Sequence, residues 1–276
     1  MGDMDRLRKL AQELRNREET TKSLEVASSR QKSMMPDPPD IPGFDISVAY
    51  TPASEVSGDF YDFFIAKNGE LAMVIADVTG HGVEAGIIMG MAKATVNIYG
   101  RIYDGPAEVL RAANRDLAAN LDGKTFICLT LTLLDAKNRK LRIARAGADR
   151  PLHFNPAWKP PEPQELRTKG LALGLDPGER FDQLLEEAEI SLQPGDLYLQ
   201  FTDGIVEAVN AEKEQFSEQR IKDTIKRYPR ASTRELLVIL KEALVDFTRT
   251  RDYDDDITLM ALKVREQQAS RKAAFL

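Results

Sequence analysis

The sequence predicts a layered α+β protein built on antiparallel sheets. Two observations predict this class: short apolar runs of strand length follow one another in pairs joined by turn residues, and helices in pairs interrupt these runs. A doubly wound parallel sheet would instead alternate single strands with single helices. The 276 residues are 42% hydrophobic, which is enough for one large domain or two small ones with a substantial core.

A long helix is predicted at residues 4–33. Its narrow apolar stripe suits a two-stranded coiled coil, although a solvated helix folded back on its own domain is the alternative. Four prolines between 36 and 42 end this helix, because proline lacks the N–H and restrains the residue before it. The stripe consists of Leu7, Leu10, Leu14, Thr21 and Leu24, with Arg17 at the one missing position. The predicted organisation is a helix at 1–35, a linker at 36–43, a globular domain at 44–265 and a polar tail at 266–276.

The globular part is predicted to contain hairpins and paired helices. The dipeptide Asn68-Gly69 marks a tight turn between two of the strands. A proline-rich loop at 151–163 contains the only tryptophan and is interpreted as a mobile flap. Strands are expected at 44–50, 60–65, 71–76, 126–134, 140–146, 184–192, 197–201 and 257–264, and helices at 82–99, 106–121, 217–227 and 232–249.

Composition excludes several classes of function. The 38 basic and 44 acidic residues give a net charge of −6 without a Lys/Arg block, so nucleic acid is not an expected partner. The longest uncharged stretch, 125–134, is about half of the ~20 residues that a membrane-spanning helix needs. The one cysteine, Cys128, lies in an apolar run and is expected in the core. Together with a polar N-terminus, this predicts a cytoplasmic protein.

Four aspartates lie at the ends of predicted strands. Unpaired carboxylates at the edge of a core are costly to desolvate and repel one another unless cations lie between them. Oxygen ligands without cysteine favour Mg²⁺ or Mn²⁺ over zinc. The alternative is that each aspartate caps a turn or a helix. These residues are Asp59, Asp77, Asp203 and Asp255.

The sequences around these aspartates resemble a known family. In order along the chain they read PASEVSGDFYD at 52–62, DVTGHGVEA at 77–85, PGD at 194–196, TDGIVEA at 202–208 and DDIT at 255–258. This set is similar to the PPM-type metal-dependent serine/threonine protein phosphatases, in particular the bacterial RsbU-like and SpoIIE-like branch. The resemblance implies an α-β-β-α sandwich of two antiparallel sheets flanked by helices, with the N-terminal helix as a coiled-coil linker.

The same resemblance implies a centre with two Mn²⁺ or Mg²⁺ ions. Asp77 would bridge the ions, Asp59 and the backbone carbonyl of Val78 would complete one, and Asp203 with Asp255 would hold the other. Asp256 is the alternative to Asp255. Such a centre activates water for in-line attack on phosphorus, so no covalent phosphoenzyme is needed. These residues are therefore the expected catalytic and metal-binding set.

The resemblance also implies a substrate and partners. The expected substrate is a phosphorylated STAS-domain anti-anti-sigma factor in a partner-switching pathway, with a homodimer formed through the N-terminal helix and a sensor upstream. Where many relatives have Asn-Ala-Gly-His, this chain has Arg-Ala-Gly-Ala ending at Ala148. That change favours the alternative of a catalytically weak scaffold. His81 could protonate the leaving oxygen, but we prefer a role in fixing the turn at 80–82 by hydrogen bonding.

Overall fold

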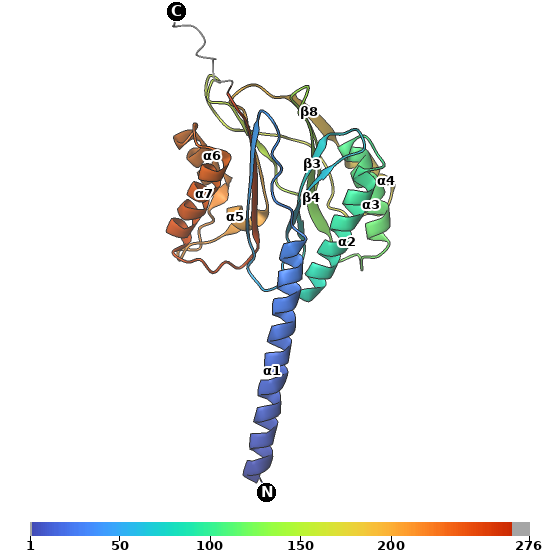
Figure 1. Cartoon of the computed structure of the whole chain (residues 1–276), viewed down its shortest axis with the longest axis vertical. Helices are drawn as coiled ribbons and strands as arrows, with labels where there is room; N and C mark the ends of the chain where they lie inside the picture. Colours follow the sequence, from blue (N-terminus) through green and yellow to red (C-terminus); the bar gives the residue numbers. More distant parts are fainter. Residues whose placement is uncertain (1, 267–276) are drawn as a thin grey trace, which may run out of the picture.

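Two five-stranded antiparallel sheets stack face to face, and helices cover both outer faces (Figure 1). This computed structural model describes residues 2–266, so most of the predicted tail at 266–276 lies outside the described residues. The predicted α-β-β-α sandwich is confirmed. The first sheet has the order β1 (Phe44–Thr51), β10 (Ile257–Val264), β9 (Leu197–Phe201), β6 (Leu152–Phe154) and β7 (Gln164–Glu165). The second has the order β2 (Phe60–Ile65), β3 (Leu71–Val78), β4 (Ile127–Asp135), β5 (Lys140–Ala146) and β8 (Glu187–Ser191).

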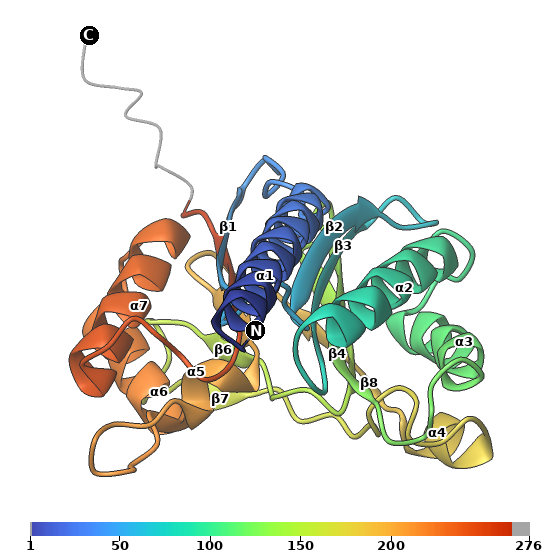
Figure 2. The same cartoon turned by 90° about the horizontal axis from the view of Figure 1, so that it is seen from below.

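The helices divide between the two sheets. Helices α2 (Val83–Gly100) and α3 (Pro106–Ala118) cover the second sheet, and α6 (Ser217–Arg227) and α7 (Thr233–Thr248) cover the first (Figure 2). Two short helices, α4 (Glu179–Leu184) and α5 (Asp203–Glu207), lie in the connections. None of the helices in residues 2–266 has the length and apolar character needed to cross a bilayer.

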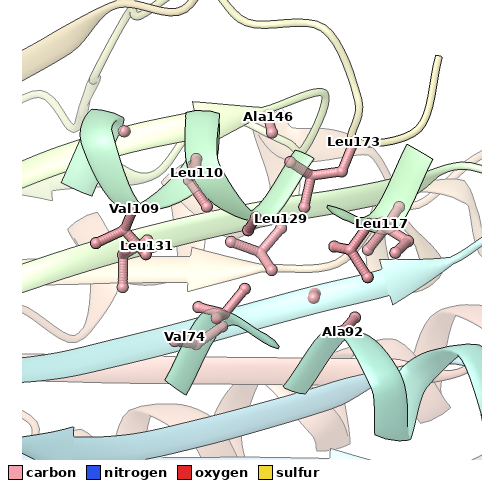
Figure 3. Close-up of a cluster of buried hydrophobic side chains, with 14 of the residues drawn as sticks. Val74, Ala92, Val109, Leu110, Leu117, Leu129, Leu131, Ala146 and Leu173 are labelled. Carbon is pink, nitrogen blue, oxygen red and sulfur yellow. The ribbon is translucent and has the colours of Figure 1, made fainter. Parts of the chain in front are cut away.

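Successive side chains along each strand point to opposite faces of the sheet, so a strand can pack against helices on one face and against the other sheet on the other. In the second sheet, Val74, Leu129 and Leu131 face α2 and α3 in one buried cluster (Figure 3). The strand neighbour Met73 points the other way and packs between the sheets in a cluster with Tyr198. Burying each large apolar side chain contributes about 1.5–3 kcal/mol. The central strands are therefore buried on both faces, and loops at their ends are left to form a site.

Most predicted elements form within a few residues of their expected bounds. The exceptions lie between 150 and 207, where α4, α5, β6 and β7 were not expected. Strand β6 pairs with β9, and the Asn155 side chain donates hydrogen bonds to the Pro194 carbonyl and to Asp196 at 3.2 and 2.6 Å. The segment at 151–163 is thus anchored to the first sheet, which contradicts the flap interpretation. Strand β6 was not predicted because its three residues are too few to show an alternating pattern.

The predicted N-terminal helix is α1 (Gly2–Ser33), and its first turns project away from the sandwich (Figure 1). Its last turns contact the domain: the buried Gln31 side chain donates to the Ser57 carbonyl at 2.7 Å and accepts from the Ser57 N–H at 2.9 Å. A Cβ added at Gly86 of α2 would lie 2.3 Å from Val56, so glycine there allows this close packing. One end of α1 therefore reaches the loop that precedes Asp59.

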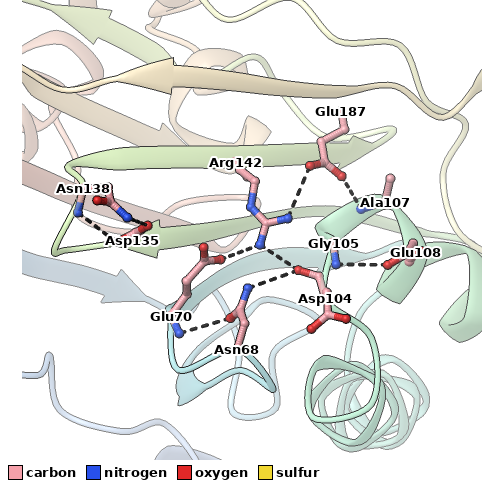
Figure 4. Close-up of polar contacts among 10 residues, drawn as sticks. All are labelled: Asn68, Glu70, Asp104, Gly105, Ala107, Glu108, Asp135, Asn138, Arg142 and Glu187. Atoms are coloured by element: carbon pink, nitrogen blue, oxygen red, sulfur yellow. Dashed lines mark hydrogen bonds and ion pairs between the residues drawn. The ribbon is translucent and has the colours of Figure 1, made fainter.

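A polar network ties the far end of the second sheet to α3 (Figure 4). Arg142 of β5 donates to the Glu70 carboxylate at 2.6 Å and to the Asp104 carbonyl at 2.7 Å. Glu187 of β8 accepts from the Ala107 N–H at the start of α3, at 3.3 Å. These contacts satisfy groups at a helix start that would otherwise be unpaired. They hold the α2–α3 connection against the sheet.

Candidate active site

The β2–β3 hairpin forms the first wall of the site. Asp59 directly precedes β2, and Asp77 is the next-to-last residue of β3. A Cβ added at Gly58 would lie 2.7 Å from the Val78 carbonyl oxygen, closer than real Cβ atoms approach. Glycine at 58 therefore lets this segment touch the end of β3. As a result, Asp59, Asp77 and the Val78 carbonyl lie in one region.

The start of α5 and the segment before β10 form the second wall. Asp203 is the first residue of α5, and Asp255 lies two residues before β10. A Cβ added at Gly204 would lie 2.0 Å from the Asp256 carbonyl oxygen, so the two segments can meet only because residue 204 is glycine. This contact brings Asp203 close to Asp255.

Two threonines link the walls. The hydroxyl groups of Thr202 and Thr258 both donate to the same oxygen of Asp59, the former at 2.8 Å. The Thr258 N–H in turn donates to the Thr202 hydroxyl at 3.0 Å. All three side chains are buried. The Asp59 carboxylate is thus held by hydroxyl donors from the opposite sheet.

Asp256 has a different role from its neighbour Asp255. One of its oxygens accepts from the Ala53 N–H at 2.7 Å, and the other accepts from the Ser57 hydroxyl at 2.6 Å and the Gly58 N–H at 2.9 Å. Both oxygens of this buried carboxylate are therefore engaged in holding the loop before Asp59. This engagement favours Asp255 over Asp256 as a metal ligand.

A cavity of about 120 Å³ opens between the walls. It combines carboxylates with small residues, and Glu207 of α5 also lines a second cleft of about 470 Å³ beside Asp255. The site is therefore a narrow acidic pocket that continues into a wider cleft. Residues lining the pocket include Asp77, Cys128, Gly147, Ala148, Asp149, Thr202, Asp203 and Glu207.

Burial and like charges raise the pKa values of these acids. Burial, with the charges of Asp203 and Asp255, raises the pKa of Asp77 to about 7. Burial and then the Asp77 charge raise the pKa of Asp59 well above its usual range, although the hydrogen bonds from the threonines oppose this. The pKa values of Asp203 and Asp255 are also raised, again mainly by burial. Protons or cations must therefore offset the repulsion.

The donor set fits hard divalent cations. Carboxylates and the Val78 carbonyl supply only oxygen ligands, which suit Mg²⁺ and Mn²⁺. Within residues 2–266, no three His, Cys, Asp or Glu side chains are grouped tightly enough to form a preassembled metal centre. Instead, Asp77 and Asp203 line the cavity, Asp255 lines the neighbouring cleft, and these acids interact through their charges. The arrangement can bind cations between separated carboxylates.

Asp149 belongs to this site, although sequence reasoning missed it. It lines the pocket, and one of its oxygens is buried with no hydrogen-bond partner among residues 2–266. Burial and then the Asp203 charge raise the pKa of Asp149 to about 6. The sequence signal for Asp149 is its position directly after Ala148, where the chain differs from the motif of many relatives, just beyond the strand predicted at 140–146.

Two smaller expectations need correction. Cys128 is only half-buried, pairs in register with Asp77 on the neighbouring strand and lines the same pocket, so it is not a core residue; burial raises the pKa of its thiol to about 12. His81 is exposed and forms no side-chain hydrogen bond within the described part of the chain. The turn there is made by Gly80 and Gly82, with φ values of 97° and 78°. The turn-fixing role for His81 is therefore wrong.

The chain has relatives in sequence and in fold. The family described as Stage II sporulation protein E (SpoIIE) matches residues 67–265. The phosphoserine phosphatase RsbU of Bacillus subtilis is 27% identical over 259 residues, which cover 91% of this chain and 73% of RsbU. Protein IcfG of Synechocystis is 28% identical over 269 residues, covering 87% of this chain, but the chain spans only 41% of IcfG.

The fold comparison agrees with the sequence comparison. The SiaA-PP2C domain of Pseudomonas aeruginosa superposes with a TM-score of 0.75 at 21% identity, over 90% of this chain and 97% of that domain. The family match covers more than half of the chain and includes Asp77, Asp203 and Asp255. The chain therefore belongs to the SpoIIE family, with the fold of PP2C-type phosphatase domains, as the resemblance predicted.

Proposed function

We propose that this chain is a metal-dependent protein serine/threonine phosphatase acting on a phosphorylated STAS-domain anti-anti-sigma factor in a bacterial partner-switching pathway. The observation that carries the proposal is the gathering of four aspartates from separate segments: Asp77 and Asp203 line one cavity, Asp255 lines the cleft beside it, and the buried Asp59 interacts with Asp77 through its charge. Membership of the SpoIIE family and similarity to a named phosphoserine phosphatase support the reaction class.

Two Mn²⁺ or Mg²⁺ ions are the proposed cofactors. Asp77 would be shared, Asp59 and the Val78 carbonyl would complete one site, and Asp203 with Asp255 would form the other. When bound, the cations would activate water and neutralise phosphate charge during in-line displacement.

The protein's own groups prepare this site for an anion. Thr202 and Thr258 donate hydrogen bonds to Asp59, which favours its ionised form and fixes its orientation. The glycines at 58 and 204 bring the two walls into contact without a side chain between them. A phosphate dianion would be repelled by the bare carboxylates, so we expect its binding to require divalent cations.

The test compares wild type with Asp77→Asn and with Asp40→Asn, a control whose side chain is 92% exposed. Wild type should hydrolyse a chromogenic aryl phosphate and phosphorylated STAS proteins only with Mn²⁺ or Mg²⁺. Asp77→Asn should lose about a thousandfold or more in kcat/KM, and Asp40→Asn should retain full activity. Initial rates with each metal, and after chelation, provide the measurement.

The rival function is a catalytically weak scaffold, which Ala148 at the pocket favours. Wild type that binds Mn²⁺ by calorimetry but hydrolyses neither substrate would support the scaffold and contradict the phosphatase. Activity on the aryl phosphate without any activity on STAS proteins would preserve the reaction class and refute the substrate.

We further propose a homodimer in which α1 pairs with its copy and relays a signal from an upstream sensor, in the bacterial cytoplasm. The side chains of Leu10 and Leu14 are 49% and 59% exposed, so these two leucines of the predicted seam face solvent in one chain. Because α1 also contacts the Ser57 loop, pairing could shift the balance between states of the first wall.

The dimer test uses Leu10→Gln/Leu14→Gln, with Gln12→Ala/Glu19→Ala on the opposite side of α1 as the control pair. Sedimentation equilibrium should give a dimer for wild type and the control, and a monomer for the leucine variant. A monomeric wild type at ~100 μM, a concentration that populates dimers with micromolar affinity, would refute the proposal.

A further inference from the structure

A groove between the end of α6 and the start of α7 lies far from the carboxylate site. It has a volume of about 790 Å³ and is open to solvent along α7. Strand β10 begins next to Asp255 and ends near this groove, so its eight residues, at ~3.3 Å each, separate the two places. Residues lining the groove are Arg227, Tyr228, Pro229, Arg230, Ala231, Arg234, Glu235, Val238 and Ile239.

The groove combines an apolar floor with a cationic rim. Tyr228 and Val238 line the groove and are 43% and 56% exposed, so apolar surface of both side chains faces solvent there. Three arginines surround them at positions 227, 230 and 234, all exposed. Among residues 2–266, none of the three forms an ion pair or a side-chain hydrogen bond, although most other arginines and lysines of α6 and the strands do.

The one acid that lines the groove, Glu235, forms no ion pair with the rim arginines among residues 2–266. The Glu235 carboxylate accepts hydrogen bonds from the Ser232 N–H and the Ser232 hydroxyl, both at 2.8 Å, in the capping box that starts α7. Its charge is therefore directed to the helix start. Three guanidinium groups thus face one carboxylate, and the groove is net positive on a chain whose overall charge is −6.

The groove is also held in shape by the sheet beneath it. Lys263 of β10 donates to the Pro229 and Ala231 carbonyls at 3.1 and 2.7 Å, and Asp45 of β1 accepts from the Thr233 N–H at 2.9 Å. The loop between the helices is thus fixed at both ends by polar contacts. A preformed site of this kind binds a partner with a smaller entropic cost than a mobile loop does.

We infer that this groove docks an acidic amphipathic helix of a partner protein, with aliphatic side chains against Tyr228 and Val238 and carboxylates against the three arginines. Aromatic and arginine side chains are enriched where protein interfaces carry most of their energy. A helix laid along an open apolar groove is a common mode of recognition. This inference goes beyond the proposed phosphatase function and does not depend on it.

The probe is a fluorescein-labelled 16-residue helical peptide with leucines at i, i+3, i+4 and i+7 spacing and glutamates elsewhere. Full-length protein should bind it saturably, with a Kd on the order of tens of micromolar, and more weakly at high salt. Arg227→Glu/Arg230→Glu/Arg234→Glu should weaken binding at least tenfold. The control Lys124→Glu/Lys137→Glu/Arg180→Glu, which makes the same charge change at exposed residues elsewhere, should leave it unchanged.

A second variant guards against misfolding of the triple variant. Val238→Asp changes one exposed position on the floor and should also weaken binding several-fold, with an unchanged circular dichroism spectrum. Equal weakening by the control, or no saturable binding, would overturn the proposal. So would binding to phosphatidylglycerol vesicles in place of the peptide, or a dimer that the rim substitutions dissolve.

Discussion

The two walls of the carboxylate site differ in how firmly they are held. On the hairpin wall, Asp59 is almost completely buried and receives two hydroxyl donors, and the preceding loop is fixed by Asp256 and Gln31. On the other wall, Asp255 is more exposed than Asp59, accepts only the neighbouring Asp256 N–H among residues 2–266, and borders an open cleft. The Asp59 carboxylate is therefore built into the fold, whereas the Asp255 carboxylate has few fixed partners and is open to solvent.

This difference separates residues that shape the site from residues that bind in it. Carboxylates whose oxygens all accept hydrogen bonds contribute to stability, because their removal leaves buried donors unpaired. Carboxylates that only repel one another reduce stability until a cation arrives. Adjacent aspartates can thus have opposite effects on folding and still belong to one site.

The largest expected effect comes from replacing Asp256 and Asp255 by asparagine, one at a time. Asp256→Asn would place an amide N–H₂ against the Ser57 and Gly58 donors and should lower the free energy of unfolding by about 2–4 kcal/mol. Asp255→Asn should leave stability unchanged or slightly higher without divalent cations, and should abolish metal-dependent hydrolysis. Urea unfolding in chelator and initial rates with Mn²⁺ measure the two properties.

Equal losses of stability in Asp255→Asn and Asp256→Asn would contradict the proposed difference between the two aspartates, because Asp255 would then also be a structural residue. Asp40→Asn, at an exposed position, sets the background change for removal of one negative charge.

A smaller effect should appear in the dependence of stability on pH. A carboxyl whose pKa is raised in the folded state binds its proton more tightly there than in the unfolded chain. For Asp77 the pKa is raised from 3.8 to about 7, so its stabilising contribution is full below about pH 4 and is lost as the pH rises through about 7. In chelator, the free energy of unfolding should fall by ~1–3 kcal/mol between about pH 5 and pH 8.

Added Mn²⁺ should remove this decline, because the cation favours the ionised carboxylates. Asp77→Asn should reduce the decline without metal, since one of the titrating groups is gone. Thermal melts at several pH values test both statements, and a profile for Asp77→Asn identical to wild type would contradict them.

The sequence was sufficient for the layers of the fold and for the main carboxylates. Strands such as β2, β9 and β10 have strong apolar patterns bounded by turns, and their observed bounds match the expected ones. The aspartates could be grouped because their flanking motifs resemble a family, and not because spacing alone places them together. The coiled coil, the substrate and the ligand roles stay predictions.

What could not be predicted depends on contacts between distant segments. Strand β6 has three residues and exists because β9 lies beside it, so no local period reveals it. Asp149 follows the departure at Ala148, but that position alone does not place it with the other acids, and the pocket does. Likewise, the roles of Asp255 and Asp256 differ only in which N–H groups the folded chain brings to each.

The most local effect should come from the contact between α1 and the hairpin wall. Gln31→Ala removes two hydrogen bonds to the Ser57 backbone and should cost about 1–3 kcal/mol locally, because a buried N–H and C=O lose their partners. Since α1 contacts the sandwich through its last turns, the loss should free that end without unfolding the sheets. Amide exchange at 24–35 should then accelerate more than tenfold, while β3 and β4 stay protected.

Gln31→Ala also tests whether contact with α1 contributes to the rigidity of the hairpin wall. Ser57 also donates its hydroxyl to Asp256, so a loosened Ser57 should allow Asp59 more freedom and weaken Mn²⁺ binding a few-fold in calorimetry. Gln12→Ala on the exposed part of α1 should change neither measurement. Faster exchange at 24–35 with unchanged Mn²⁺ affinity would mean that the wall is rigid on its own, and that α1 acts on the site, if at all, through α2.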